Sequence, residues 1–351
     1  AAPVGATDAA SVGALQRDAR ALVVRDNLPA LSVAVMRDGH IVWAEAFGLA
    51  DMDARRAATP ETLFRIGALS QLLTSAAVGV LHERGMLDLE RPFQDYVPAY
   101  PEKAWPISTR QLMAHTSGLR NRNMPPRHCA TVDDAVPVWA GDAPAGPSGM
   151  AYRYSPYNWV LVSAVVEHAA GEPFAAFVTR EVIGATGLRH TVADQGDTMP
   201  GRAALYFPRI DQKTQWGHQE APGADYSCWS GAGMFDSTPS DLVQFGDAMM
   251  RPGLLQADTL AVLYAPQTLD TGETTGRGLG WRVDQVPIAG TATRLISQEG
   301  SPMGGTATLQ AAPDLGIVVA LTSNVSFARG LAPFGLKVLE AFAQPRPAAV
   351  R

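Results

Sequence analysis

The chain has 351 residues, 46% of them hydrophobic and 18% charged, which is enough for one large core or two packed lobes. The net charge of −6 is spread along the chain without a basic stripe, so the sequence predicts no nucleic-acid partner. No apolar run reaches the roughly eighteen residues that span a bilayer, which predicts no membrane span. The seven histidines show no paired spacing, so we expect neither a metal site nor a cofactor.

The first part of the chain alternates between helical and extended patterns. Residues 9–24 have the composition of a helix, and residues 31–36 and 41–47 read as two strands. Asp38 and Gly39 between these strands predict a type I′ hairpin turn. Residues 64–74 then predict the first turns of a buried helix, and residues 76–84 predict a second amphipathic helix that Gly85 ends.

The middle of the chain holds a long irregular segment, residues 121–149, which is rich in proline, glycine and arginine. Segments of this kind are commonly rims of binding sites or mobile loops. Arg120, Arg122 and Arg127 lie in or beside it. Two interpretations stay open for these arginines: a solvated loop, or a group that attracts an anionic ligand to a cleft.

The last part predicts both helices and strands. Residues 152–167 read as a turn followed by a helix that ends near Gly171, and residues 230–234 as a glycine-rich turn. A helix is expected to begin around Pro239, after Ser237 and Thr238. The remaining elements are strands at 278–283, 294–297, 306–310 and 317–322 and a helix at 328–342.

Three motifs give the chain a family resemblance. They are Phe64-Arg65-Ile66-Gly67-Ala68-Leu69-Ser70-Gln71, the segment Ile107 to Leu119 (ISTRQLMAHTSGL) and the segment Ser230 to Leu242. In order and content they resemble the penicillin-recognising serine hydrolases, which include class C β-lactamases, DD-peptidases, family esterases and the mitochondrial β-lactamase-like protein. The resemblance implies an α/β (α+β) fold with an antiparallel sheet flanked by terminal helices. It places an α/β lobe at 1–60 and 225–351, a helical lobe at 61–224, and an active-site-like cleft between them.

The reactive residues of that family are mostly replaced here. Its S-x-x-K motif supplies a serine nucleophile and a lysine base, and these positions hold Ala68 and Gln71. An alanine has no nucleophilic atom, and an amide has no pKa suited to a base near neutral pH. The histidine of H-x-G is Gln298, whereas the tyrosine of Y-x-N is kept as Tyr154. None of the three lysines, Lys103, Lys213 and Lys337, completes another S-x-x-K.

The resemblance also assigns candidate roles to single residues. Ligand contacts are expected at Ala68, Gln71, Tyr154, Gln298, Gly300 and Ser301. The backbone N–H groups of Ala68 and Ser301 would still bind a carbonyl or carboxylate, because side-chain identity does not affect them. Ser155 is the candidate substitute nucleophile, and by resemblance His115 is structural.

Three functions remain open on the sequence. One is a pseudoenzyme whose cleft binds a peptide, a peptidoglycan fragment or an acyl ligand; a second is an active serine hydrolase with an unconventional nucleophile. The third is a partner-binding protein with a vestigial cleft. The start Ala-Ala-Pro fits a mature periplasmic or secreted protein after signal-peptide removal. Cys129 and Cys228 either form a disulfide or are two buried small hydrophobic residues.

Overall fold

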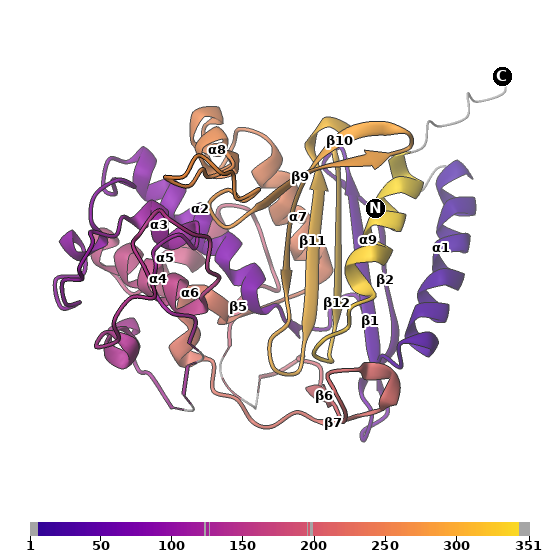
Figure 1. The fold of residues 1–351 in the computed structure, drawn as a ribbon. Helices are drawn as coiled ribbons and strands as arrows, with labels where there is room; N and C mark the ends of the chain where they lie inside the picture. Colours follow the sequence, from indigo (N-terminus) through magenta and orange to yellow (C-terminus); the bar gives the residue numbers. More distant parts are fainter. Residues whose placement is uncertain (1–5, 123, 126, 195, 197–198, 344–351) are drawn as a thin grey trace.

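A seven-stranded sheet forms one side of the molecule (Figure 1). The computed structural model describes residues 6–122, 124–125, 127–194, 196 and 199–343. Every neighbouring pair in the sheet is antiparallel, which confirms the predicted sheet. In spatial order the strands are β3 (Arg56–Ala57), β2 (His40–Asp51), β1 (Ala30–Arg37), β12 (Ile317–Ser323), β11 (Thr306–Ala312), β10 (Thr291–Gly300) and β9 (Arg282–Ile288).

Strand β1 lies in the interior of this sheet and contributes to a hydrophobic core on each of its two faces. Its side chains alternate, so Val33 and Val35 join the core on one face while Ala34 and Met36 join the core on the other. Both residues of the hairpin turn to β2 have positive φ, +52° at Asp38 and +80° at Gly39. This is the geometry of the predicted type I′ turn.

Helices cover both faces of the sheet. On one face α1 (Ala6–Arg25) and α9 (Leu331–Ala343) pack together against β2 and β12 (Figure 1). On the other face α7 (Pro239–Met250) packs against β1, β11 and β12. Thr238 caps α7, since its side chain accepts a hydrogen bond from the backbone N–H of Asp241. These three helices were predicted from the sequence to within a few residues.

The second side of the molecule is mostly helical. Its helices are α2 (Ser70–Glu83), α3 (Thr109–Met113), α4 (Pro156–Ala170), α5 (Phe174–Val178), α6 (Ser230–Gly233) and α8 (Ala257–Tyr264). A π-helical segment, Thr179–Gly184, follows α5. Short 3-10 helices lie at Gly67–Leu69, Phe93–Asp95, Val132–Asp134, Val136–Trp139, Thr214–Trp216, Ser227–Trp229 and Pro313–Leu315. Two small sheets are formed by β4 (Phe64–Arg65), β8 (Phe235–Ser237) and β5 (Val192–Ala193), and by β6 (Tyr206–Pro208) and β7 (His218–Glu220).

Several predicted boundaries were wrong. The helix expected from residue 64 begins at Ser70 and continues through the separately predicted segment 76–84, because strand β4 and a 3-10 turn precede it. The expected glycine-rich turn at 230–234 contains the short helix α6. The strand expected at 278–283 begins at Arg282, since Gly278 donates to the Trp281 carbonyl in a tight turn.

The division into lobes stays a prediction. Strand β6 forms a bridge with Val325 beside the large sheet, although it lies within residues 61–224. Helix α8 packs against α2, although it follows residue 225. None of the described helices is by itself long and apolar enough to cross a membrane; α4 together with Phe174–Gly184 meets the length and composition as a pair bent by 79°.

Candidate ligand-binding cleft

The entry to α2 places Ala68 on the wall of a cavity. Strand β4 leads into Gly67, whose φ is +52° and whose Cα lies against the ring of Pro302. A β-carbon at residue 67 would lie 2.6 Å from that ring, so glycine is required there. Ala68 is partly exposed, whereas Ser70 is completely buried and its hydroxyl accepts a hydrogen bond from the Phe235 N–H. Of the two positions, only residue 68 faces the cavity.

A row of uncharged polar side chains leads from the sheet to the cavity. The Gln298 Nε2 donates to the Gln71 Oε1 over 3.4 Å, and the Gln71 Nε2 donates to the Tyr154 hydroxyl over 3.3 Å. Gln71 and Gln298 are buried behind the cavity wall, and the Tyr154 side chain lies on that wall. Burial of the Tyr154 hydroxyl raises its pKa above the usual 10, and the hydrogen bond from Gln71 acts in the opposite direction. The hydroxyl therefore keeps its proton near neutral pH.

The cavity has a volume of about 800 Å³ and is lined mainly by apolar and aromatic side chains. A ligand pocket of this size holds a drug-sized or short peptide ligand. Tyr226 and Trp229 stack on each other at a ring-centroid distance of 5.8 Å and form part of one wall. The other large apolar groups of the lining are Met124, Pro125, Pro156, Pro222, Pro302 and Met303.

The end of β10 runs directly past the start of α2. A β-carbon at Gly300 would lie 2.1 Å from the Ile66 carbonyl oxygen and 2.9 Å from the Ala68 nitrogen, so only glycine permits this approach. The next residue, Ser301, lines the cavity together with Ala68. Within the part of the chain that the structure describes, the backbone N–H groups of Ala68 and Ser301 donate to no protein acceptor. Both N–H groups are thus free to bind an oxygen atom.

Ser155 lies outside the cavity lining. Its side chain is completely buried, and its hydroxyl donates to the Arg120 carbonyl oxygen over 3.1 Å. Its backbone N–H lies 3.2 Å from His115 Nδ1. The geometry gives Ser155 a structural contact and does not favour it as a substitute nucleophile.

His115 is buried beneath Tyr154, with a ring-centroid distance of 4.6 Å. Its φ is +58°, and its ring nitrogens face the N–H of Ser155 and the Nε1–H of Trp159, each 3.2 Å away. A neutral imidazole has one acceptor nitrogen, so it accepts from one of the two donors at a time. Burial, and secondarily the charge of Arg277, lower the pKa of His115 to about 3. These contacts support the expected structural role.

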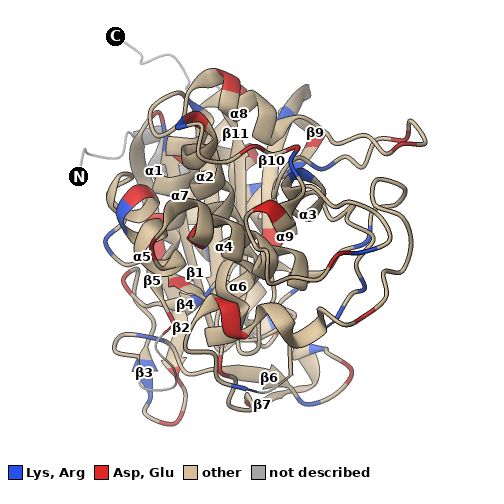
Figure 2. Cartoon of the chain, turned by 90° about the vertical axis from the view of Figure 1, so that its left-hand side faces the viewer, with Lys and Arg blue, Asp and Glu red and all other residues tan. Residues whose placement is uncertain are grey.

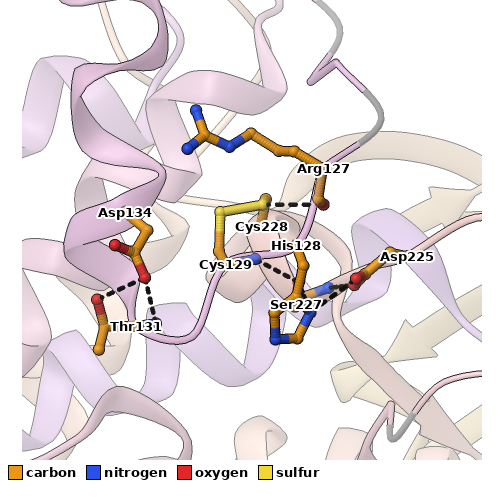
Figure 3. The surroundings of a disulfide bond; sticks show 8 residues. All are labelled: Arg127, His128, Cys129, Thr131, Asp134, Asp225, Ser227 and Cys228. Carbon is orange, nitrogen blue, oxygen red and sulfur yellow. Dashed lines mark hydrogen bonds and ion pairs between the residues drawn. A yellow bond between two sulfur atoms is a disulfide. The ribbon is translucent and has the colours of Figure 1, made fainter.

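A disulfide joins two walls of the cavity (Figure 3). Cys129 follows Arg127 on the long middle loop, and Cys228 lies between Tyr226 and Trp229, so residues of the lining flank both cysteines. Two further contacts accompany the bond. His128 pairs with Asp225 over 2.8 Å, and the Ser227 hydroxyl accepts from the Cys129 N–H over 2.9 Å. We name residues 127–129 with 225–228 the clasp.

Comparison with known proteins decides the family. The family model described as Beta-lactamase matches residues 15–335. This chain belongs to the Beta-lactamase family. Penicillin-binding protein 4* of Bacillus subtilis (strain 168) is 25% identical over 285 residues, which cover 77% of this chain and 62% of that protein. Serine beta-lactamase-like protein LACTB, mitochondrial, of Bos taurus is 24% identical over 334 residues, which cover 68% of this chain and 59% of that protein.

The chain spans only 59–62% of the length of these two relatives of the Beta-lactamase family. Solved structures share its fold. EstCE1, described as a hydrolase with promiscuous acyltransferase activity, superposes with a TM-score of 0.82 at 21% identity and covers 97% of this chain and 100% of its own. The D-amino acid amidase from Ochrobactrum anthropi SV3 has a TM-score of 0.79 at 20% identity, covering 94% and 98%. These values confirm the serine β-lactamase-like fold.

The chain thus keeps the fold of the Beta-lactamase family. Within this fold the candidate residues form two groups that differ in their position relative to the cavity. Ala68, Tyr154 and Ser301 line the cavity, whereas Gln71, Gln298 and Gly300 lie behind it. Sequence reasoning missed the aromatic wall of Tyr226 and Trp229. The two cysteines were the available signal for this wall, because their pairing brings residues 225–229 to the middle loop.

The three arginines of the middle loop do not form one cluster. Arg127 lines the large cavity, whereas Arg120 and Arg122 line a separate hollow. Arg122 pairs with Asp142 over 2.9 Å. Figure 2 shows basic and acidic residues interspersed over the face that it presents. The expectation of no nucleic-acid partner stays a prediction.

The described residues contain no group of three or more His, Cys, Asp or Glu side chains that would hold a metal ion. The expected absence of a metal and of a cofactor stays a prediction.

A buried network of ion pairs packs against the wall of the cavity. Arg65 donates from Nε to Asp194, from Nη2 to the Ala224 carbonyl, and stacks on the Tyr226 ring at 4.4 Å. Arg202 pairs with Asp194 over 2.8 Å and with Asp236 over 3.4 Å. The network therefore holds two residues of the cavity lining, Ala224 and Tyr226, in place.

Asp236 makes the stability of this network depend on pH. Its side chain is completely buried and Oδ1 has no partner among the described residues. Burial, and secondarily the Asp194 carboxylate, raise the pKa of Asp236 from its ordinary value near 4 to about 7. The folded protein therefore holds this proton more tightly than the unfolded chain does. The free energy of unfolding falls as the pH rises from about 4 through about 7.

The variant Asp236→Asn is expected to lose this part of the pH dependence, because an amide cannot ionise. Urea unfolding at about pH 5 and about pH 8 should show the parent losing on the order of 3 kcal/mol more than the variant, since each pKa unit corresponds to about 1.4 kcal/mol. Equal pH dependence in the two proteins would contradict the assigned role of Asp236.

Proposed function

We propose that the protein is a catalytically inactive member of the Beta-lactamase family whose cleft binds a ligand without covalent turnover. One observation carries the proposal: the cavity wall has the methyl group of Ala68 where the family's motif has a hydroxyl, with the neutral Gln71 one turn later. The pKa of Tyr154 is raised, so its phenol does not act as a base near neutral pH. Groups that act together in catalysis lose most of their effect when one is removed.

The shape of the cleft supports binding. The cavity is roomy and keeps two backbone donors, at Ala68 and Ser301, on its wall. We infer that its ligand is a peptide, a peptidoglycan fragment or a small acyl compound. Penicillin-binding protein 4*, whose name states that it binds penicillin, has the same family frame. A vestigial cleft, with function transferred to a partner-binding surface, does not explain an open cavity of about 800 Å³.

We also propose a periplasmic or secreted location. The Cys129–Cys228 disulfide supports it, since disulfides persist in oxidising compartments and are rare in the reducing cytosol.

Intact-mass spectrometry tests the proposal. The protein is incubated separately with a penicillin and with a fluorophosphonate, and thermal unfolding is followed with muropeptides and with acyl-peptides. We expect no covalent adduct, together with a rise in the unfolding temperature for at least one ligand class, because a ligand that binds only the folded state stabilises it. Denatured protein serves as the control for non-specific labelling.

Two results would replace the proposal. A stoichiometric adduct mapped to one serine would identify an active hydrolase with an unconventional nucleophile. The absence of both adduct and thermal shift would favour a partner-binding protein with a vestigial cleft.

A further inference from the structure

A second hollow, which we name the arginine hollow, shares no lining residue with the large cavity. Its volume is about 270 Å³, and it is lined by Arg120, Asn121, Arg122, Ala145 and Arg153. This lining contains three guanidinium groups and no carboxylate. Two of the arginines belong to the middle loop that the sequence singled out, and Arg153 joins them from a distant part of the chain.

Hydrogen bonds of the backbone hold these arginines in one place. The Arg153 N–H donates to the His115 carbonyl oxygen over 2.7 Å, and the Ser155 hydroxyl donates to the Arg120 carbonyl oxygen over 3.1 Å. Both bonds join the segment that carries Arg153 to the segment that carries Arg120 and Arg122. The fold itself therefore keeps three like charges around one hollow.

The side chains of these arginines keep most of their donors available. Arg120 donates from Nε to the Ala143 carbonyl oxygen over 2.9 Å, and Arg122 donates from Nε to the Asp142 carboxylate over 2.9 Å. Among the residues that the structure describes, these two side chains make no other hydrogen bond, and the Arg153 side chain makes none. Because a guanidinium has further N–H donors besides Nε, all three groups can bind a ligand in the hollow.

The charges around the arginine hollow do not balance. Asp142 pairs with Arg122, and no described carboxylate lies within ion-pairing distance of Arg120 or Arg153. Lys103 adds a further positive charge nearby, since its Nζ donates to the Asp142 carbonyl oxygen over 3.0 Å. Like charges that a fold holds together repel one another and disfavour the compact state, and a bound anion relieves this repulsion.

We propose that the arginine hollow binds the phosphate group of a small phosphate ester. A guanidinium is a planar fork that donates two parallel hydrogen bonds to a phosphate. A phosphate monoester carries about 1.5 to 2 negative charges at pH 7 and three acceptor oxygens, so it can bind more than one arginine at a time. The volume lies just below the range of pockets for drug-sized ligands, roughly 300–1,000 Å³, which suits a small ester.

Calorimetric titration at fixed ionic strength tests this site. Glycerol 3-phosphate is compared with glycerate, which has the same number of carbon atoms and one carboxylate. We expect glycerol 3-phosphate to bind with a dissociation constant of about 1 mM or below. It should bind about tenfold or more tightly than glycerate, because it offers more charge and more acceptors to the arginines. Vesicles that contain phosphatidic acid present the same group on a lipid and are not expected to bind the protein.

Two arginine variants locate the effect. Arg153→Gln removes a guanidinium that makes no hydrogen bond within the described protein, and it is expected to weaken binding of glycerol 3-phosphate about tenfold or more. Arg209→Gln is the matched control, because it removes the same charge. Arg209 is also exposed, and its Nε donates to a backbone carbonyl oxygen, that of His218, over 2.9 Å, but it lies outside the hollow. This variant is expected to keep the affinity of the parent.

Several results would overturn the inference. They are glycerate binding as tightly as glycerol 3-phosphate, no saturable binding below about 10 mM, and equal affinities of Arg153→Gln and Arg209→Gln. Vesicle binding that Arg153→Gln abolishes would replace the small ester by a lipid headgroup. None of these results bears on the proposed inactivity, since the two hollows share no lining residue. Conversely, a covalent adduct in the large cavity would overturn the proposed function and leave the phosphate site standing.

Discussion

Replacing Ala68 by serine and Gln71 by lysine in one protein is expected to produce a stoichiometric covalent adduct with a fluorophosphonate. Residue 68 lies on the cavity wall, and residue 71 lies one turn later with its side chain 3.3 Å from the Tyr154 hydroxyl. The buried site would also favour an uncharged amine, because Gln298 presents an N–H group to position 71 and burial disfavours an ammonium ion. An uncharged amine is the form that takes a proton from serine.

The single variants are the controls for this gain of reactivity. Ala68→Ser supplies a hydroxyl without a base, and Gln71→Lys supplies a base without a nucleophile. We expect the double variant to label roughly 10²–10⁴ times faster than Ala68→Ser, the range that general-base assistance provides. Intact mass followed over time gives the rates, and peptide mapping should place the adduct at residue 68. If the double variant is labelled no faster than Ala68→Ser, the two restored side chains are not sufficient for reactivity. The surrounding backbone would then also differ from the geometry that acylation requires.

Removal of the disulfide is expected to lower both the free energy of unfolding and the affinity of the cleft for its ligand. The Cys129→Ala, Cys228→Ala double variant opens a loop of 99 residues, and a native disulfide typically contributes roughly 2–4 kcal/mol by restricting the unfolded chain. The bond also fixes the clasp, so the wall with Tyr226 and Trp229 should move more freely relative to the middle loop. Urea unfolding measures the first effect, and calorimetric titration with the muropeptide or acyl-peptide that raises the unfolding temperature measures the second.

A variant of the clasp is the control for the loss of stability. Asp225→Asn removes the charge that pairs with exposed His128 and leaves the disulfide intact. Because an exposed ion pair contributes at most about 1 kcal/mol, we expect this variant to keep the stability of the parent within that margin. If the cysteine variant loses stability but binds the same ligand as tightly as the parent, the clasp does not order the wall of the cavity.

The sequence predicted the frame of the fold because that frame depends on local patterns. Asp38 and Gly39 form a hairpin turn by their own backbone preferences, and Thr238 caps α7 through its own side chain. The start of β9 was predicted wrongly, because it does not depend on a local pattern. Its start at Arg282 depends on the turn at residues 278–281 and on pairing with β10, which are contacts beyond the local sequence.

The candidate site was predicted in part. Ala68, Gln71, Tyr154 and Gln298 could be found because motifs mark their positions, and the structure joins the last three in one row. Their separation into wall and interior was not predictable, since it depends on how β10 packs against α2. The place of Ser155 beside Tyr154 likewise predicted a side chain that faces the site, yet its hydroxyl donates to the Arg120 carbonyl oxygen.

The position of β1 has a consequence for the order of folding. One neighbour of β1 in the sheet is β2, which follows it directly in the chain, and the other is β12 near the opposite end, with Ser32 facing Thr322. During synthesis the hairpin of β1 and β2 emerges early with β1 as an unpaired edge strand that is mostly apolar, and contacts of such long sequence separation form slowly. The large sheet can close only after Ser323 has been made. Until then that edge is open to pairing with another molecule.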